Sequence, residues 1–119
     1  MNDPVAMSFA FKHKAMELRD IVAEHLPTEL RVGMALLEAM SPAAMTTAFA
    51  EQVACYSPQI KEHDADFFMS DTVGTDPTLM ALRASWHQLP VDKQACVWQV
   101  LPMMCNISKR YVKLVTEHP

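Results

Sequence analysis

Residues 76–100 read DPTLMALRASWHQLPVDKQACVWQV and contain two apolar segments at helical spacing, each opened by a proline. Asp76 and Pro77 begin the first segment, and Pro90 precedes the second, whose first turn carries Asp92. Proline fits the first turn of a helix, where its missing N–H has no helical partner to lose. An acid there suits the positive end of the helix dipole. The stretch therefore predicts two consecutive helices.

A proline next to a residue that can cap a helix also occurs toward the N-terminus, at Pro27-Thr28 and at Ser41-Pro42. Apolar residues before, between and after these points step by three or four, which is the spacing of one helix face. Across the chain, the predicted inward faces are Phe11, Ala15, Leu18 and Val22; Leu30, Met34 and Leu37; Met45, Phe49, Val53 and Tyr56; Leu79, Leu82, Trp86 and Leu89; and Val97, Trp98, Leu101, Met104, Tyr111 and Leu114. Short links between the helices predict antiparallel neighbours.

The last helix should begin near Val91 and continue past Pro102, because the apolar periodicity persists on both sides of that proline. Pro102 has no N–H to give to the preceding turn, so we expect a kink there rather than a stop. Residues 57–76 are ambiguous: one or two helical turns are expected after Pro58, followed by a loop over 70–76. The fold expected is an all-α, compact bundle of five to six short helices in a single domain, 1–119.

Composition excludes several broad classes. The 119 residues carry a net charge of −4, which argues against general nucleic-acid binding, since that binding depends on Lys and Arg. No stretch approaches the roughly 20 uncharged residues of a membrane span. The N-terminal charge order is the reverse of a secretory signal, and Cys55, Cys96 and Cys105 form no CxxC pair. We expect an intracellular protein with no membrane contact.

No motif predicts catalysis, a cofactor or a metal site. No serine of the chain lies in the sequence pattern of a nucleophile elbow, and no cysteine has the local signature of a cysteine hydrolase. His63 lies in the segment EHDAD beside Glu62, Asp64 and Asp66, but this spacing matches neither a calcium loop nor a zinc site. We interpret the segment as a solvated acidic turn that caps a helix; a metal-dependent hydrolase around His63 stays a third hypothesis.

Two apolar groups are candidate protein-binding residues: Phe67, Phe68 and Met69, and the pair Met103 and Met104. Methionine is flexible, so ten methionines suit either core filling or a surface that accepts a partner helix. The leading hypothesis is a non-enzymatic helical protein-interaction module that binds a protein partner or forms a homo-oligomer.

Residues 60–111 follow an order in which Ile-x-x-x-Asp and a paired aromatic precede a Leu-Pro turn, after which a Lys and a Trp begin the final helix. This order resembles that of short all-helical proteins encoded by large double-stranded DNA viruses of algae and amoebae. The residues that carry the resemblance are Ile60, Asp64, Phe67, Phe68, Trp86, Leu89, Lys93, Trp98 and Leu101, with a looser match over 11–27. Pro102 departs from the uninterrupted final helix of that pattern. The resemblance implies a viral or infected-cell setting, in host cytoplasm or virion, and no known activity.

Three cations, Lys109, Arg110 and Lys113, give the last helix a basic face that could contact an anion or nucleic acid. Cations also suit the negative C-terminal end of a helix, so a solvated helix end is the simpler interpretation. The alternative function is an accessory factor in viral transcription or nucleic-acid handling, with residues 59–76 as an acidic recruiting segment.

Overall fold

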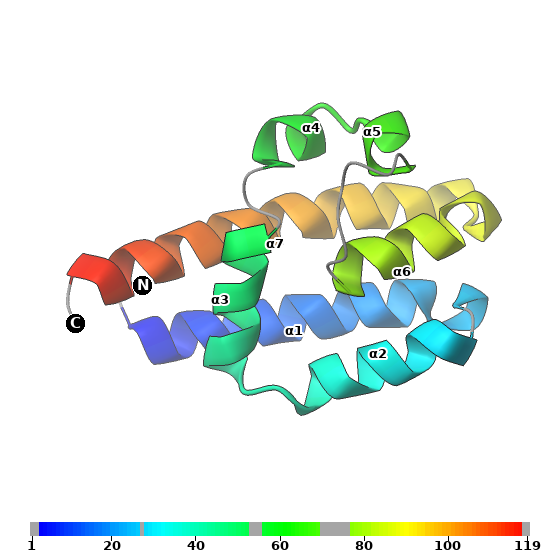
Figure 1. Ribbon diagram of the computed structural model, residues 1–119. Helices are drawn as coiled ribbons and strands as arrows, with labels where there is room; N and C mark the ends of the chain where they lie inside the picture. The colour runs from blue at the N-terminus through cyan, green and yellow to red at the C-terminus, as the bar shows by residue number, and fades with distance from the viewer. Residues whose placement is uncertain (1–2, 27, 53–55, 70–76, 118–119) are drawn as a thin grey trace.

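A computed structural model describes residues 3–26, 28–52, 56–69 and 77–117, and over these ranges the chain is helical without any strand (Figure 1). The predicted all-α class is confirmed. The helices are α1 (Pro4–Val22), α2 (Thr28–Ala39), α3 (Pro42–Gln52), α4 (Ser57–Lys61), α5 (Ala65–Met69), α6 (Pro77–Ser85) and α7 (Val91–Glu117). Short 3-10 turns, Ala23–His25 and Trp86–Gln88, extend α1 and α6.

Helices α1 and α7 form the spine of the bundle and run antiparallel, side by side (Figure 1). Lys93 Nζ lies 3.5 Å from Glu24 Oε2 at one end, and Met7 lines the same hollow as Arg110 at the other. With 19 and 27 residues, α1 and α7 are long helices, and α7 begins at Val91 as expected.

The core lies where α3, α4 and α6 pack against this spine. The rings of Phe11 and Phe49 meet edge to face, with centroids 5.0 Å apart. Burial of each large aliphatic side chain contributes about 1.5–3 kcal/mol. The buried side chains that join the core from the predicted inward faces are Phe11, Ala15, Leu18, Val22, Met45, Phe49, Leu79, Leu82, Leu89, Val97, Leu101 and Met104. Val53, and the side chains of Leu30 and Leu37, lie outside the described residues.

Helix α7 continues through Pro102 and does not stop there, as predicted. The kink expected at Pro102 stays a prediction. Leu101 and Met104 are buried on either side of Pro102, so the inward stripe is continuous past the missing N–H. At 1.5 Å per residue the helix is about 40 Å long, close to the 42 Å long axis of the molecule. Helix α7 thus extends along nearly the whole length of the molecule.

Residues 57–69 form two short helices, α4 and α5, which is more helix than the one or two turns expected. The backbone N–H of Asp64 donates to Gln59 O at 3.0 Å and that of His63 to Ile60 O at 3.2 Å, the bond pair of a Schellman helix end. His63 occupies the left-handed position, with φ 55°. Asp64 then caps α5, because its Oδ1 accepts the N–H of Phe67 at 3.1 Å. The loop expected over 70–76 lies outside the described residues.

Helix α2 lies at the edge of the bundle and packs on α6 through a small cluster of Leu26, Met34 and Ala81. An ion pair between Arg19 Nη1 and Glu38 Oε1, 2.8 Å apart, ties α2 to α1. Hydrogen bonds to Glu38 and to Asp20 raise the pKa of the Arg19 guanidinium above its ordinary value, so the cation persists at neutral pH. Among the described side chains of α2, those of Arg31, Val32, Ala35, Leu36 and Ala39 are exposed.

Candidate functional site

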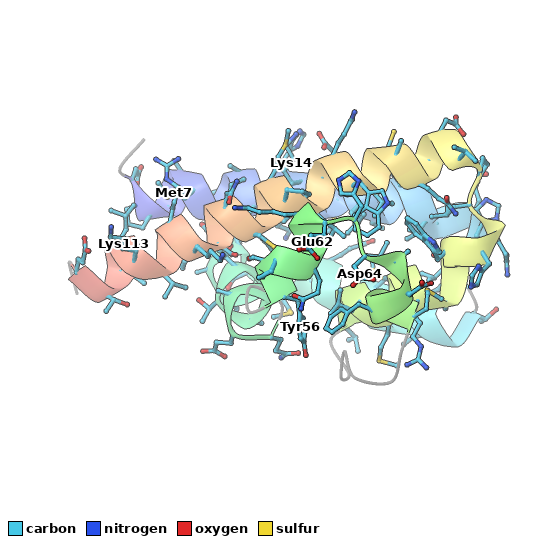
Figure 2. All side chains as sticks on the ribbon, turned by 90° about the horizontal axis from the view of Figure 1, so that it is seen from above. Met7, Lys14, Tyr56, Glu62, Asp64 and Lys113 are labelled. Atoms are coloured by element: carbon cyan, nitrogen blue, oxygen red, sulfur yellow. The ribbon has the colours of Figure 1, made fainter. Side chains whose placement is uncertain are left out.

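Of the candidate residues of α5, Phe67 lies against the core. Phe67 is half-buried, and its ring meets that of Tyr56 edge to face at 5.2 Å; Figure 2 shows Tyr56 on this side of the molecule, with Glu62 and Asp64. Phe67 also packs against the main cluster of buried residues. The side chain of Phe68 lies outside the described residues. Phe67 therefore serves first to anchor α5.

Met69 borders a hollow of about 260 Å³ between α5, α6 and α7. Its floor includes two tryptophans, Trp86 and Trp98, whose rings are 5.3 Å apart in an edge-to-face arrangement. The space that the hollow leaves for a water-sized molecule is only about 20 Å³, whereas pockets for drug-sized ligands measure roughly 300–1,000 Å³, so the hollow is too small for such a ligand. Its complete lining is Ala65, Met69, Leu82, Arg83, Trp86, Val97, Trp98 and Leu101.

The adjacent methionines of α7 occupy opposite environments. Met104 is 1% exposed and belongs to the core, whereas Met103 is 47% exposed. Consecutive residues on a helix point about 100° apart, so a pair cannot share one surface. Met103 is available to a partner and Met104 is not.

A groove follows the seam between α1 and α7, and we call it the α1–α7 groove. It consists of two neighbouring hollows of about 500 and 460 Å³, both of which are lined by Met7 and Arg110. Its lining residues are Met7 and Ala10 from α1, and Ile107, Arg110, Lys113, Leu114 and Glu117 from α7. Figure 2 shows Met7 and Lys113 at the same end of the molecule.

The three predicted cations are all exposed, but the structure separates them. Arg110 and Lys113 line the α1–α7 groove, whereas Lys109 lines neither hollow. No side chain in the described ranges forms an ion pair with Arg110 or Lys113. The groove thus combines an apolar floor with the cations of Arg110 and Lys113 and the carboxylate of Glu117.

The outer face of α2 carries an apolar stripe that the sequence analysis missed. Val32 and Leu36 are 62% and 68% exposed, and Ala35 and Ala39 are exposed beside them. We call these four residues the α2 outer stripe. The sequence analysis assigned only the inward stripe of α2; the apolar residues left over on the opposite face were the available signal.

Among the described residues, the charged groups show no arrangement typical of catalysis. A shallow hollow of about 740 Å³ between α1 and α2 contains Arg19, Arg31, Glu24 and Glu38, but Arg19 is bound to Glu38, and Arg31 Nε donates to Leu26 O at 3.0 Å. Within the described ranges, no three His, Cys, Asp or Glu side chains gather as a metal site would require. No helix there combines the length and apolar character needed to cross a membrane.

The buried hydroxyls are also committed to local structure. Thr46, Ser85 and Ser108 each donate to a carbonyl one turn earlier in their own helices, at 2.7, 2.8 and 3.0 Å respectively. Cys105 is buried and Cys96 is exposed. The hydroxyl groups of Thr46, Ser85 and Ser108 thus donate to backbone carbonyls and not to a base, which an activated nucleophile would require.

Comparison with protein-family models, with curated proteins and with solved structures found no match to this chain. The resemblance to short viral helical proteins stays a prediction, and the surfaces described above carry the functional argument.

Proposed function

We propose that the protein is a non-enzymatic helical protein-interaction module that associates with a second copy of itself through the α2 outer stripe. The observation that carries this proposal is the exposure of Val32 and Leu36, two large apolar side chains one turn apart on an edge helix. Association of helices through apolar residues at such spacing requires shape and apolar anchors, and no reactive group.

The stripe is complementary to itself. Its four positions, 32, 35, 36 and 39, have the spacing by which one helix packs along another. When two copies of α2 are aligned antiparallel about a twofold axis, one register places Val32 opposite Ala39 and Leu36 opposite Ala35. Each large side chain then faces a small one, and both occurrences of each pairing are equivalent, as a twofold interface requires.

The test is the mass of the protein in solution, measured by sedimentation equilibrium over the micromolar range. We expect a dimer. Leu36→Glu should give a folded monomer with the helix content of the unmodified chain, because Leu36 is mostly exposed within one copy and a buried unpaired carboxylate at the interface is costly.

Val91→Glu is the matched control, since Val91 is 82% exposed and lies on α7, away from α2. It should leave the dimer intact. A monomer for the unmodified chain, or a dimer that Leu36→Glu leaves unaffected, would contradict the proposal.

A further inference from the structure

We infer that the α1–α7 groove is a docking site for an acidic amphipathic helix of a partner protein. This surface is separate from the α2 outer stripe, so the inference goes beyond the proposed self-association and does not depend on it.

The shape of the groove suits a helix. Ile107, Arg110 and Leu114 follow one another at spacings of three and four and thus lie along one side of α7, next to Met7 and Ala10 of α1. From Ile107 to Glu117 the groove runs about 15 Å, which matches roughly three turns of a docked helix.

Its floor offers apolar contact along that length. Met7 is buried, Ala10, Ile107 and Leu114 are half-buried, and Met103 extends the same side of α7 one turn further as an exposed thioether. Methionine adapts its shape to a partner, and half-buried aliphatic side chains gain from further burial. A partner helix should therefore bring an apolar stripe.

The charge of the groove indicates which polar residues the partner helix should carry. Arg110 and Lys113 stand on its edge without an ion pair to any side chain of the described ranges, and Glu117 is its one acid, at the far end. Carboxylates flanking the partner's apolar stripe would pair with both cations, and Arg offers a carboxylate two donors at once.

A helix is favoured over nucleic acid because, among the described residues, no aromatic side chain lines the groove to stack a base, and because the net charge of −4 opposes a polyanion at long range.

The experiment measures fluorescence anisotropy of a labelled synthetic peptide of about 12 residues, with Leu at helical spacing and Glu elsewhere. Unlabelled protein is titrated into it, as the unmodified chain and as Leu36→Glu. We expect saturable binding of equal strength to both. A peptide with Lys in place of every Glu should bind at least tenfold more weakly, since two exposed ion pairs become repulsive, at about 1 kcal/mol each.

The double variant Arg110→Gln/Lys113→Gln should weaken binding of the acidic peptide about three- to tenfold, and Lys109→Gln less than about twofold. Lys109→Gln is the matched control, because it removes one cation from the same helix outside the groove. Met103→Glu should also weaken binding.

Three outcomes would overturn the inference: no binding of the acidic peptide, equal binding of the Lys peptide, or equal losses in Lys109→Gln and the double variant. A fourth would be retention on duplex DNA that is lost in the double variant while peptide binding is unchanged, which would assign the cations to nucleic acid instead.

Discussion

The imidazole of His63 stacks on the indole of Trp98, with ring centroids 4.8 Å apart and ring planes 7° from parallel. His63 ends α4 in the left-handed backbone region, a position usually held by glycine. Trp98 belongs to α7, so the stacked pair connects the turn between α4 and α5 to the spine of the bundle. The stacking contact offsets the backbone cost that a residue with a Cβ bears there.

The first prediction separates these two contributions. His63→Ala keeps the backbone cost and loses the stacking, so we expect a loss of about 1 kcal/mol in the free energy of unfolding. His63→Gly loses the stacking but relieves the backbone, and should stay within about 0.5 kcal/mol of the unmodified chain. Urea unfolding measures both. The exposed His87, replaced by Ala, is the control, and an equal loss in the Ala and Gly variants at position 63 would refute this account.

The second prediction concerns the cap of α5. Asp64→Ala removes the acceptor of the Phe67 N–H and should destabilise the protein by about 1 kcal/mol, whereas Asp64→Asn should retain most of the stability. Asp66→Ala, in the first turn of the same helix, should cost less than about 0.5 kcal/mol. Thermal and urea unfolding would check the order. If Asp66→Ala proves as costly as Asp64→Ala, the effect is one of charge and not of capping.

The third prediction compares the two adjacent methionines of α7. Met104→Ala opens a cavity in the core and should cost about 2–5 kcal/mol, because the side chain is fully buried. Met103→Ala should cost less than about 1 kcal/mol, since that side chain is nearly half exposed. Chemical unfolding of both variants supplies the measurement, with circular dichroism as the control for helix content. Similar losses would mean that α7 is rotated relative to the structure described here.

The fourth prediction concerns the ion pair that links α1 to α2. Arg19→Gln should lower the free energy of unfolding by about 0.5–1 kcal/mol, the range of partly exposed ion pairs, and the difference should shrink at high salt. The folded-state pKa of Arg19 is raised, so its charged form contributes fully at neutral pH, and this contribution fades only as pH rises through strongly alkaline values.

Amide hydrogen exchange gives the local test of the same variant. Protection in α2 should fall in Arg19→Gln while that of α7 is retained. Lys14→Gln is the control, because Lys14 pairs with Glu17 within α1 alone. Equal loss of protection in both helices would indicate that the ion pair supports the whole fold.

Local pattern predicted the helices and most of the core. The spacing of Phe11, Ala15, Leu18 and Val22 fixes the inward side of α1, because a helix repeats every 3.6 residues whatever it packs against. The continuation of α7 past Pro102 followed from the same periodicity. His63 escaped prediction as a helix end because the usual signal there, glycine, is absent.

The surfaces could be predicted only in part. The spacing of the apolar residues already placed Met104 on the inward side of α7. Because consecutive helix residues point about 100° apart, Met103 then lies off that side. The different exposure of the two methionines could therefore be predicted from the sequence. The α1–α7 groove could not, because the neighbourhood of Met7 and Arg110 depends on the alignment of two helices about a hundred residues apart in the chain. For α2, Val32 and Leu36 on the outer face were visible in the sequence, but whether another element covers that face depends on the tertiary arrangement.

The pairing of α1 with α7 also has a consequence for synthesis on the ribosome. Phe11 and its neighbours emerge early, yet the helix that covers them is translated last among the described elements. At a translation rate of about 5–20 residues per second, the apolar side of α1 stays exposed to solvent for several seconds. During this time a molecular chaperone can bind the exposed apolar side of α1, and that side is covered once α7 has been synthesised and packs against it.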